Sequence, residues 1–153
     1  MGERAARLRL ETVFAEVLRA ARADGPATVI ALGWATVDVD RAASDFERVY
    51  PGGAPYVAAT DDEWLGGRVR LGAGRIDGYR VVLLEPSTEG RLAAHLARHG
   101  EGPITAWVTS AVGDGPDEAP SSAGPFGPER PLPRGPRGTA LLLVDPRTAT
   151  IRA

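Results

Sequence analysis

The chain has 153 residues, of which 43% are hydrophobic and 25% charged, proportions that suit one globular domain with a single core. Its 18 basic and 20 acidic residues leave a net charge of −2, so no strong positive field favours nucleic acid as a partner. The absence of cysteine excludes disulfides, thiolate catalysis and cysteine-ligated metal centres.

The first predicted element is a helix over about Glu3–Ala23, which ends at the run Asp24-Gly25-Pro26. Its apolar residues recur at three- and four-residue steps, and they are Leu10, Val13, Phe14, Val17, Leu18 and Ala21. This segment is too charged for a signal peptide, and its glutamates argue against a transit peptide. Because no apolar run in the chain is long enough to span a bilayer, we expect a cytoplasmic protein without a membrane partner.

Strands and helices alternate over the middle of the chain. In order, the patterns predict a strand (28–40), a short helix (41–50), three strands (56–60, 66–74 and 79–86), a helix (89–100) and a strand (104–110). The turn residues Asp77-Gly78 separate the second and third of the three strands, and Gly100 is a typical helix C-cap.

The last third of the chain has a different composition. Seven of the 13 prolines lie between Pro116 and Pro136, so residues 111–139 are predicted to be loop with one short extended piece near Phe126. The apolar run TALLLVDP (139–146) predicts a buried strand, and ATIRA (149–153) predicts a final one.

Three motifs resemble those of the vicinal oxygen chelate superfamily, which includes glyoxalase I, methylmalonyl-CoA epimerase and the bleomycin-resistance proteins. They are ALGWATVDVDRAASDF (31–46), VVLLEPSTEGRLAAHLARHGEG (81–102) and PRGPRGTALLLVDPRTA (133–149). The resemblance implies an α+β fold in which two βαβββ modules form a curved mixed sheet around a cavity.

The same resemblance implies a division of the chain. Module one would cover about residues 28–87, a connecting helix 88–101, and a degraded module two 102–153, together forming one glyoxalase-like domain. Residues 1–27 would be an N-terminal helical extension. The apolar stripe of that extra helix must be buried, either over the gap left by the missing module-two helix or in a dimer contact.

The resemblance also implies where a metal would bind, since the superfamily takes four ligands from four strands. Those places fall on Ala31, Val82, Thr105 (or Ile104 if the register shifts by one) and Arg152. Alanine and valine have no donor atoms, arginine stays a cation, and a threonine hydroxyl alone is a poor ligand. We therefore expect no metal and no cofactor.

Period-two alternation along the strands predicts which side chains line the cavity. They are Ala31, Gly33, Ala35, Arg80, Val82, Thr105, Trp107 and Thr109. Arg80 and Arg70 are the candidate catalytic residues, because a guanidinium in an apolar cavity would bind a carboxylate or an enolate oxygen. Trp34 has the opposite parity and is expected to face a helix.

Two further polar groups are predicted to have structural roles. His95 and His99 lie four residues apart, a spacing that could bind zinc from one helix face, but the chain has no other histidine or cysteine. The resemblance puts both on the connecting helix, outside the cavity. The acidic run Asp61-Asp62-Glu63 is predicted to be a solvated turn.

Two functions are compatible with these features. The first is a metal-independent enzyme on a small organic molecule, an isomerase, cyclase or lyase of specialised metabolism. The alternative is a protein that binds and sequesters a small molecule without catalysis, as the bleomycin-resistance proteins do. An ionisable group inside the cavity would favour the enzyme, whereas shape and stacking area alone would favour binding. A homodimer is one possibility under either function.

Overall fold

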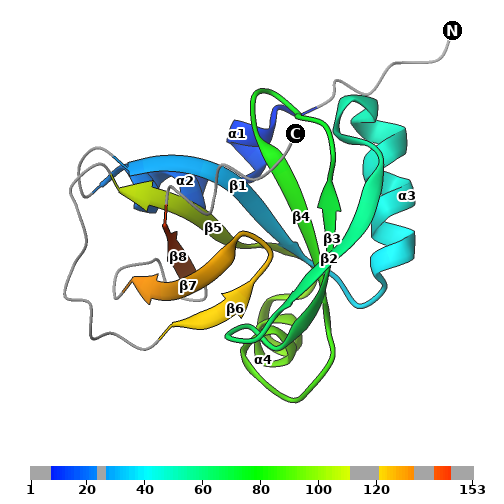
Figure 1. The fold of residues 1–153 in the computed structure, drawn as a ribbon. Helices are drawn as coiled ribbons and strands as arrows, with labels where there is room; N and C mark the ends of the chain where they lie inside the picture. Colours follow the sequence, from blue (N-terminus) through cyan, green and yellow to red (C-terminus); the bar gives the residue numbers. More distant parts are fainter. Residues whose placement is uncertain (1–7, 24–26, 111–120, 133–139, 146–153) are drawn as a thin grey trace, which may run out of the picture.

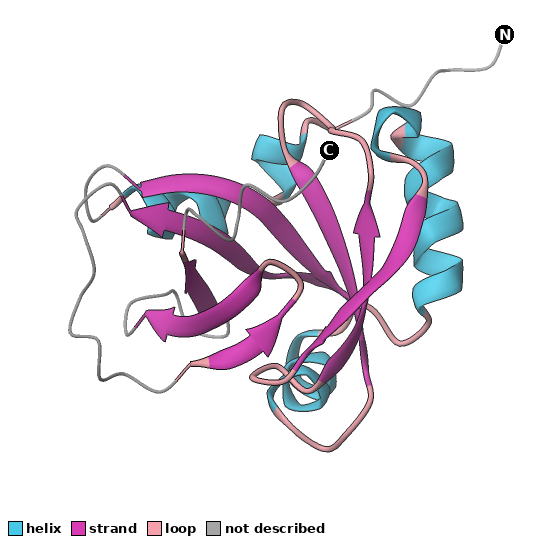
Figure 2. Cartoon of the chain, in the orientation of Figure 1, coloured by secondary structure: helices cyan, strands magenta, loops and turns pink. Residues whose placement is uncertain are grey.

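The computed structural model describes residues 8–23, 27–110, 121–132 and 140–145 of the chain. In order, its elements are α1 (Leu10–Val13), α2 (Ala15–Arg22), β1 (Ala27–Ala35), α3 (Val39–Val49), a 3₁₀ turn (Pro51–Gly53), β2 (Tyr56–Asp62), β3 (Gly67–Gly72), β4 (Arg80–Pro86), α4 (Arg91–His99), β5 (Gly102–Ser110), β6 (Ser122–Gly124), β7 (Gly127–Leu132) and β8 (Ala140–Val144). These elements confirm the predicted α+β class (Figures 1 and 2). No helix in the described ranges is long and apolar enough to cross a membrane.

The described strands form one mixed sheet in the order β2-β3-β4-β1-β5-β8-β7-β6. Each half repeats one plan, because its first strand lies parallel to its last, β1 beside β4 and β5 beside β8. The antiparallel pair β1–β5 joins the halves. The sheet curves until its two edges meet at a seam, where the Glu63 N–H donates to the Ala123 carbonyl at 3.0 Å (Figure 1). The sheet is therefore nearly barrel-shaped, and its concave side forms the interior.

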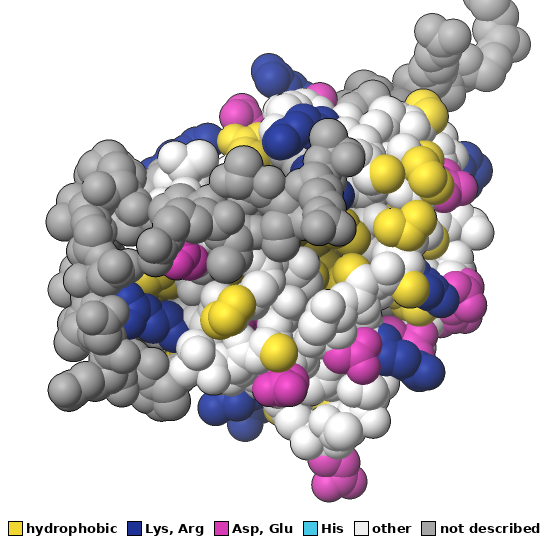
Figure 3. Space-filling view, in the orientation of Figure 1, with side chains coloured by type: hydrophobic (Ala, Val, Ile, Leu, Met, Phe, Trp, Pro, Cys, Tyr) yellow, Lys and Arg dark blue, Asp and Glu magenta, His cyan; other side chains and the backbone are white. Residues whose placement is uncertain are grey.

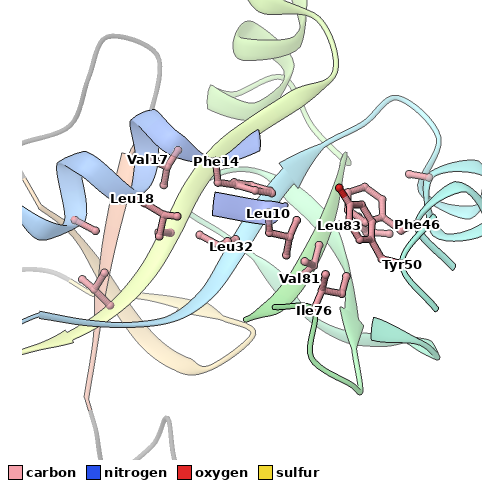
Figure 4. Packing of buried hydrophobic residues seen from close by; sticks show 14 of the residues in the cluster. Leu10, Phe14, Val17, Leu18, Leu32, Phe46, Tyr50, Ile76, Val81 and Leu83 are labelled. Atoms are coloured by element: carbon pink, nitrogen blue, oxygen red, sulfur yellow. The ribbon is translucent and has the colours of Figure 1, made fainter. Parts of the chain in front are cut away.

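Alternate residues on each strand point to opposite sides of the sheet, so two hydrophobic clusters form. On β4, Val81 and Leu83 belong to the outer cluster, whereas Val82 and Leu84 belong to the interior cluster. Figure 4 shows the outer cluster between the helices and the sheet. The interior cluster consists of Ala31, Ala35, Leu65, Val69, Val82, Leu84, Leu92, Ile104, Trp107, Phe126, Leu142 and Val144.

The N-terminal helices pack on the outer face, mainly over β5 and also against β1 and β8. Phe14 interrupts the predicted single helix and separates α1 from α2. The apolar stripe is buried within this one chain, from Leu10 and Phe14 at 0% exposure to Ala21 at 3%. The Leu10 N–H donates to Asp77 Oδ2 at 2.9 Å and fixes the start of α1. Of the two expected roles for this stripe, the structure favours covering the sheet, because the stripe needs no second subunit.

Trp34 confirms the predicted parity of β1. Its ring lies on the outer face, in edge contact with Phe14 at 6.2 Å and with Phe46 at 5.3 Å between ring centroids. Such pairs contribute about 0.5–1.5 kcal/mol each beyond the area they bury. This aromatic row links the N-terminal helices to α3 across β1.

Residues 121–132 correct the prediction of loop between 111 and 139. They form the β6–β7 hairpin, and β7 also pairs with β8. Two residues of β7, Pro128 and Pro131, lack the N–H that a strand interior normally uses, which is why composition predicted loop. Pairing on both sides stabilises the extended segment despite them. The rest of the Pro-rich stretch and the predicted strand at 149–153 lie outside the described residues.

Charged side chains of both signs are interspersed on the face seen in Figure 3. Several form ion pairs between elements, such as Arg41 with Glu101 and Arg68 with Glu85. Glu101 also accepts from the Val37 N–H at 2.9 Å. The Gly-Glu-Gly turn after α4 therefore anchors the start of α3, which is a structural role.

Replacing Phe14 with alanine tests whether α1 and α2 are part of the core. Because the ring is fully buried, we expect the unfolding free energy to fall by roughly 3 kcal/mol or more in urea titrations. The exposed neighbour Arg19 provides the control, since Arg19→Ala should change stability by less than about 0.5 kcal/mol. Equal stability of the Phe14→Ala variant and the parent chain would contradict this packing.

Candidate functional site

Strands β1, β4 and β5 bring most of the predicted cavity residues together on the interior face. Those that are buried there are Ala31, Gly33, Ala35, Val82, Thr105 and Trp107. A Cβ on Gly33 would lie 2.6 Å from Thr105 Cγ2 and 2.9 Å from Trp107 Cζ3, so only glycine leaves room for both side chains. Thr109 continues the same alternation on β5 and is half-buried. The Thr105 hydroxyl donates to the Ala140 carbonyl at 2.7 Å and ties β5 to β8.

Trp107 occupies the interior beside the smallest residues of β1. Its side chain is fully buried, and its ring meets Phe126 edge to face at 5.6 Å between centroids. The indole Nε1–H donates to Glu129 Oε2 at 2.7 Å. A buried tryptophan needs such an acceptor for its N–H, and here the acceptor is a carboxyl group on β7.

The two candidate arginines lie on different faces of the sheet. Arg80 shares the parity of Val82 on β4, is partly buried, and donates from Nε to the Gly72 carbonyl at 3.2 Å. Burial lowers the pKa of its guanidinium, and the nearby charge of Arg75 lowers it further. Arg70 instead lies 3.6 Å from Asp40 of α3, on the helix-covered face. The expectation that Arg70 projects inward is therefore wrong.

Asp62, at the end of β2, is buried with 1% of its surface exposed. Its Oδ1 accepts from the Leu65 N–H at 2.8 Å, while Oδ2 has no hydrogen-bond partner among the described residues. This corrects the prediction of a solvated Asp61-Asp62-Glu63 run, of which only Asp61 and Glu63 are exposed. The pairing of β2 with β3 is irregular between Ala59 and Asp62, and this shift turns Asp62 inward.

Glu129, on β7, is the second buried carboxyl group that sequence reasoning missed. Its exposure is 1%, and Oε1 has no hydrogen-bond partner among the described residues although Oε2 accepts from Trp107. Gly124 of β6 packs directly on the carboxyl group, where a Cβ would lie 2.2 Å from Oε2. The residue falls in the stretch predicted as loop, so alternation was not applied to it.

Asp62 and Glu129 are neighbours across the interior, and each carboxyl group affects the other. Burial raises the pKa of Glu129 to about 10, and the hydrogen bond and charge of Asp62 raise it in the same direction, whereas the Trp107 N–H opposes this. Glu129 therefore carries a proton at neutral pH. A carboxylic acid held neutral next to a second carboxyl group is a known arrangement of catalytic acids and bases.

His95 and His99 lie outside the interior, on α4, as predicted from the sequence. Their rings are 4.8 Å apart between centroids. They border a groove of about 570 Å³ against α1 and α2, and a smaller pocket of about 250 Å³ beside Trp64. Trp64 itself is covered by the Arg91 guanidinium, 4.2 Å from the ring centroid. These contacts make His95 and His99 part of the α4 surface.

The described residues do not fit the metal that the superfamily resemblance implies. Three of the four ligand places are Ala31, Val82 and Thr105, which offer at most one hydroxyl, and Arg152 lies outside the described ranges. Within those ranges no group of three or more His, Asp or Glu side chains could hold a metal ion.

Comparison with known proteins finds solved structures that share this fold. No family model matches the chain, and no curated protein matches it. Methylmalonyl-CoA epimerase from Mycobacterium tuberculosis superposes with a TM-score of 0.59 at 19% identity, over 80% of this chain and 91% of that one. A variant of the Streptomyces coelicolor epimerase in complex with 2-nitronate-propionyl-CoA gives 0.56 at 20%, over 75% and 94%. A hypothetical protein from Bacillus halodurans C-125 gives 0.51 at 19%, over 76% and 92%.

These epimerases are members of the vicinal oxygen chelate superfamily, and the curved eight-stranded sheet fits that fold. The predicted fold is thereby confirmed. At 19–20% identity, this structural similarity shows the fold alone. The chemistry of the site has to be argued from the residues of this chain.

Gly124→Ala tests how closely β6 packs on the carboxyl pair. The new methyl group would overlap the Glu129 carboxyl, so we expect a loss of about 1–3 kcal/mol in the unfolding free energy from urea titrations. The matched control is Gly90→Ala, whose Cβ would meet no atom closer than 3.6 Å and should change stability by less than about 1 kcal/mol. Equal effects of the two substitutions would argue against this packing.

The raised pKa of Glu129 predicts a pH dependence of stability. The pKa of Glu129 rises from 4.5 to about 10 on folding, so the folded chain holds one more proton than the unfolded chain between these values. The contribution of Glu129 to the unfolding free energy is therefore fully present below pH 4.5 and is lost as pH rises through about 10. Relative to Glu129→Gln, the unfolding free energy of the parent chain should therefore fall by about 1.4 kcal/mol per pH unit. Parallel curves in urea titrations would show that Glu129 is ionised in the folded state.

Proposed function

We propose that this chain, which has the vicinal oxygen chelate fold, is a metal-independent enzyme of the isomerase type that moves a proton on a small organic molecule. The observation that carries the proposal is the polar group of Asp62, Glu129 and Trp107 within an otherwise apolar interior. The structural likeness to methylmalonyl-CoA epimerases supports a small-molecule, isomerase-like role. Asp62 and Glu129, with the Trp107 N–H as a hydrogen-bond donor, offer acid–base groups that could catalyse such a reaction without a metal.

The cost of burying two carboxyl groups supports a functional reason for keeping them. Removing an ionised carboxylate from water costs on the order of several kcal/mol even after the protein relaxes around it. Leu65, Phe126 and Leu142 belong to the adjoining interior cluster, and further apolar side chains would fill the space without that cost. Groups whose burial is unfavourable and whose pKa is strongly shifted concentrate at catalytic sites.

The chemistry available to this group is acid–base catalysis. A neutral carboxylic acid at Glu129 can donate a hydrogen bond or a proton to a carbonyl oxygen, and the Trp107 N–H holds its other oxygen in place. Asp62 can accept a proton in return. Arg80, farther along the same face, would hold a carboxylate or phosphate of the bound molecule.

The alternative of a sequestering protein has less support. Such a protein needs shape and stacking area, which Trp107 and Phe126 could supply without any ionisable neighbour. It gains nothing from a carboxyl pair that must be desolvated. The pair therefore favours catalysis over binding alone.

The substrate class follows from the same chemistry. Proton transfer assisted by a carboxylic acid suits a carbon next to a carbonyl or thioester group, because the acid stabilises the enolate oxygen that forms. Known structures of the neighbouring epimerases include a complex with methylmalonyl-CoA, which makes this thioester the first probe. A place in specialised metabolism, a cytoplasmic location and a homodimer stay predictions.

Hydrogen exchange in heavy water tests this function. Protein freed of metal with a chelator would be incubated in D₂O with methylmalonyl-CoA and, separately, with small 1,3-dicarbonyl compounds. We expect mass spectrometry to show deuterium entering one of these probes at least about 100-fold faster than in buffer, the contribution typical of one acid–base group. Arg70→Ala is the control and should exchange at the parental rate, because Arg70 lies on the opposite face.

Two results would contradict the proposal. Exchange that begins only after a divalent metal is added would show that the reaction needs a metal. Saturable binding of a probe without any exchange would favour the sequestering protein.

A further inference from the structure

We infer that Asp62 and Glu129 act as one acid–base unit, in which Asp62 takes the proton from the substrate carbon and Glu129 gives a proton to the substrate oxygen. The inference rests on the proposed function and assigns the two roles within it. It also brings together residues from both halves of the sheet, since Asp62 ends β2 and Glu129 lies on β7.

The geometry of the hydrogen bonds supports a single shared proton. Each carboxyl group has one oxygen held by a donor from its own surroundings, Asp62 Oδ1 by the Leu65 N–H at 2.8 Å and Glu129 Oε2 by the Trp107 Nε1–H at 2.7 Å. The other two oxygens, Asp62 Oδ2 and Glu129 Oε1, are buried and meet no donor among the described residues. A proton held between the two carboxyl groups would satisfy both of these oxygens at once.

Neither carboxyl group has a basic partner in the part of the chain that the structure describes. The ion pairs there use other acidic residues, such as Glu85 and Glu101. Asp61 and Glu63, which flank Asp62, are exposed. Two ionised carboxylates in this position would repel each other with no cation to offset them, so the shared proton takes the place of a countercharge.

The two roles follow from which group holds the proton. Glu129 is the protonated member, because burial and the charge of Asp62 raise its pKa. Asp62 is then the member of the pair to which we assign the proton from carbon. The Trp107 N–H remains on Glu129 Oε2 and stabilises the carboxylate that Glu129 becomes when it gives its proton away.

The steps balance without any other reactant. Asp62 removes the proton from the carbon next to the carbonyl, and the electron pair of that C–H bond forms the C=C bond of an enol. The carbonyl oxygen takes the proton of Glu129 at the same time. Afterwards the enol O–H returns its proton to Glu129, and Asp62 delivers a proton to carbon. Delivery to the neighbouring end of a conjugated system completes an isomerisation, whereas delivery to the original carbon gives hydrogen exchange alone.

Because both carboxyl groups are only 1% exposed, a substrate can reach them only where the structure opens, and we place that opening at the seam. The described contacts at the seam are few: the Glu63 N–H donates to the Ala123 carbonyl at 3.0 Å, and the Ala123 N–H donates to Glu63 Oε2 at 3.4 Å. Strand β6 has three residues. Separation of β6 from the end of β2 would bring a substrate into contact with both carboxyl groups together.

Two isosteric variants and one control test the unit, with an infrared measurement beside the exchange assay. The variants are Asp62→Asn and Glu129→Gln, and the control is Asp61→Asn, which removes an exposed charge next door. At neutral pH, subtracting the Glu129→Gln spectrum from the parental spectrum should reveal the C=O stretch of one protonated carboxyl group. The same subtraction for Asp61→Asn should show none.

The probe that exchanges deuterium with the parental chain should then distinguish the base, Asp62, from the acid, Glu129. We expect the exchange rate with Asp62→Asn to fall to the rate in buffer. Glu129→Gln should lose about 100-fold in kcat with little change in KM. The parental rate should decline at high pH as Glu129 loses its proton, and this decline should be absent from Glu129→Gln. Circular dichroism and urea titration of each variant identify any loss of folding.

The outcomes distinguish this inference from the proposed function. Full exchange in a folded Glu129→Gln or Asp62→Asn variant would overturn the acid–base unit and leave the enzyme intact. A protonated-carboxyl signal without exchange of any probe would overturn the catalytic roles together with the proposed function, and the pair would then be a structural contact. Absence of the signal from the parental chain would overturn the shared proton itself.

Discussion

The antiparallel pairing of β1 with β5 is the contact on which the rest of the structure depends. It joins the two halves of the sheet, each of which would otherwise expose an unpaired strand edge. Its register sets Ala31 opposite Trp107 and Gly33 opposite Thr105. The bulky indole therefore lies against the smallest residues of β1, which leave room for it in the interior.

The carboxyl pair is a consequence of closing this sheet. Asp62 comes from the edge of the first half, while Glu129 and its donor Trp107 come from the second half. Neither half alone would hold both carboxyl groups in a dry environment. Burial is the main cause of the raised pKa of Glu129, and the contribution of Asp62 is added when β2 and β6 meet.

The two faces of the sheet differ in what they hold: a helix-covered hydrophobic cluster on the outer face, and the carboxyl pair on the interior face. On the outer face, α1, α2 and α3 bury an aliphatic and aromatic cluster that includes Phe14, Trp34 and Phe46. The helix α2 covers β5, which belongs to the second half of the sheet, and α1 packs against α2. On the interior face, the places that the superfamily resemblance assigns to metal ligands carry small or apolar residues such as Ala31 and Val82, and a carboxyl pair stands nearby. In the proposed function, a neutral acid at Glu129 would stabilise the oxyanion without a metal ion.

The sequence by itself determined the alternation of the regular strands. Period-two parity placed Trp34 outside and Trp107 inside, because successive side chains of an extended backbone point to opposite faces wherever pairing is regular. The motif at residues 81–102 indicated β4, α4 and the turn that follows. Local geometry was enough for these features, since each depends on neighbours along the chain.

Only the tertiary structure decided the site. Asp62 points inward because the β2–β3 pairing shifts between Ala59 and Asp62, and regular alternation would have turned Asp61 inward instead. Glu129 lies on a strand because β6 and β8 pair with both sides of a proline-containing segment. An irregular register and a strand stabilised by its neighbours both depend on contacts between residues far apart in the chain, and periodicity within one segment carries no record of them.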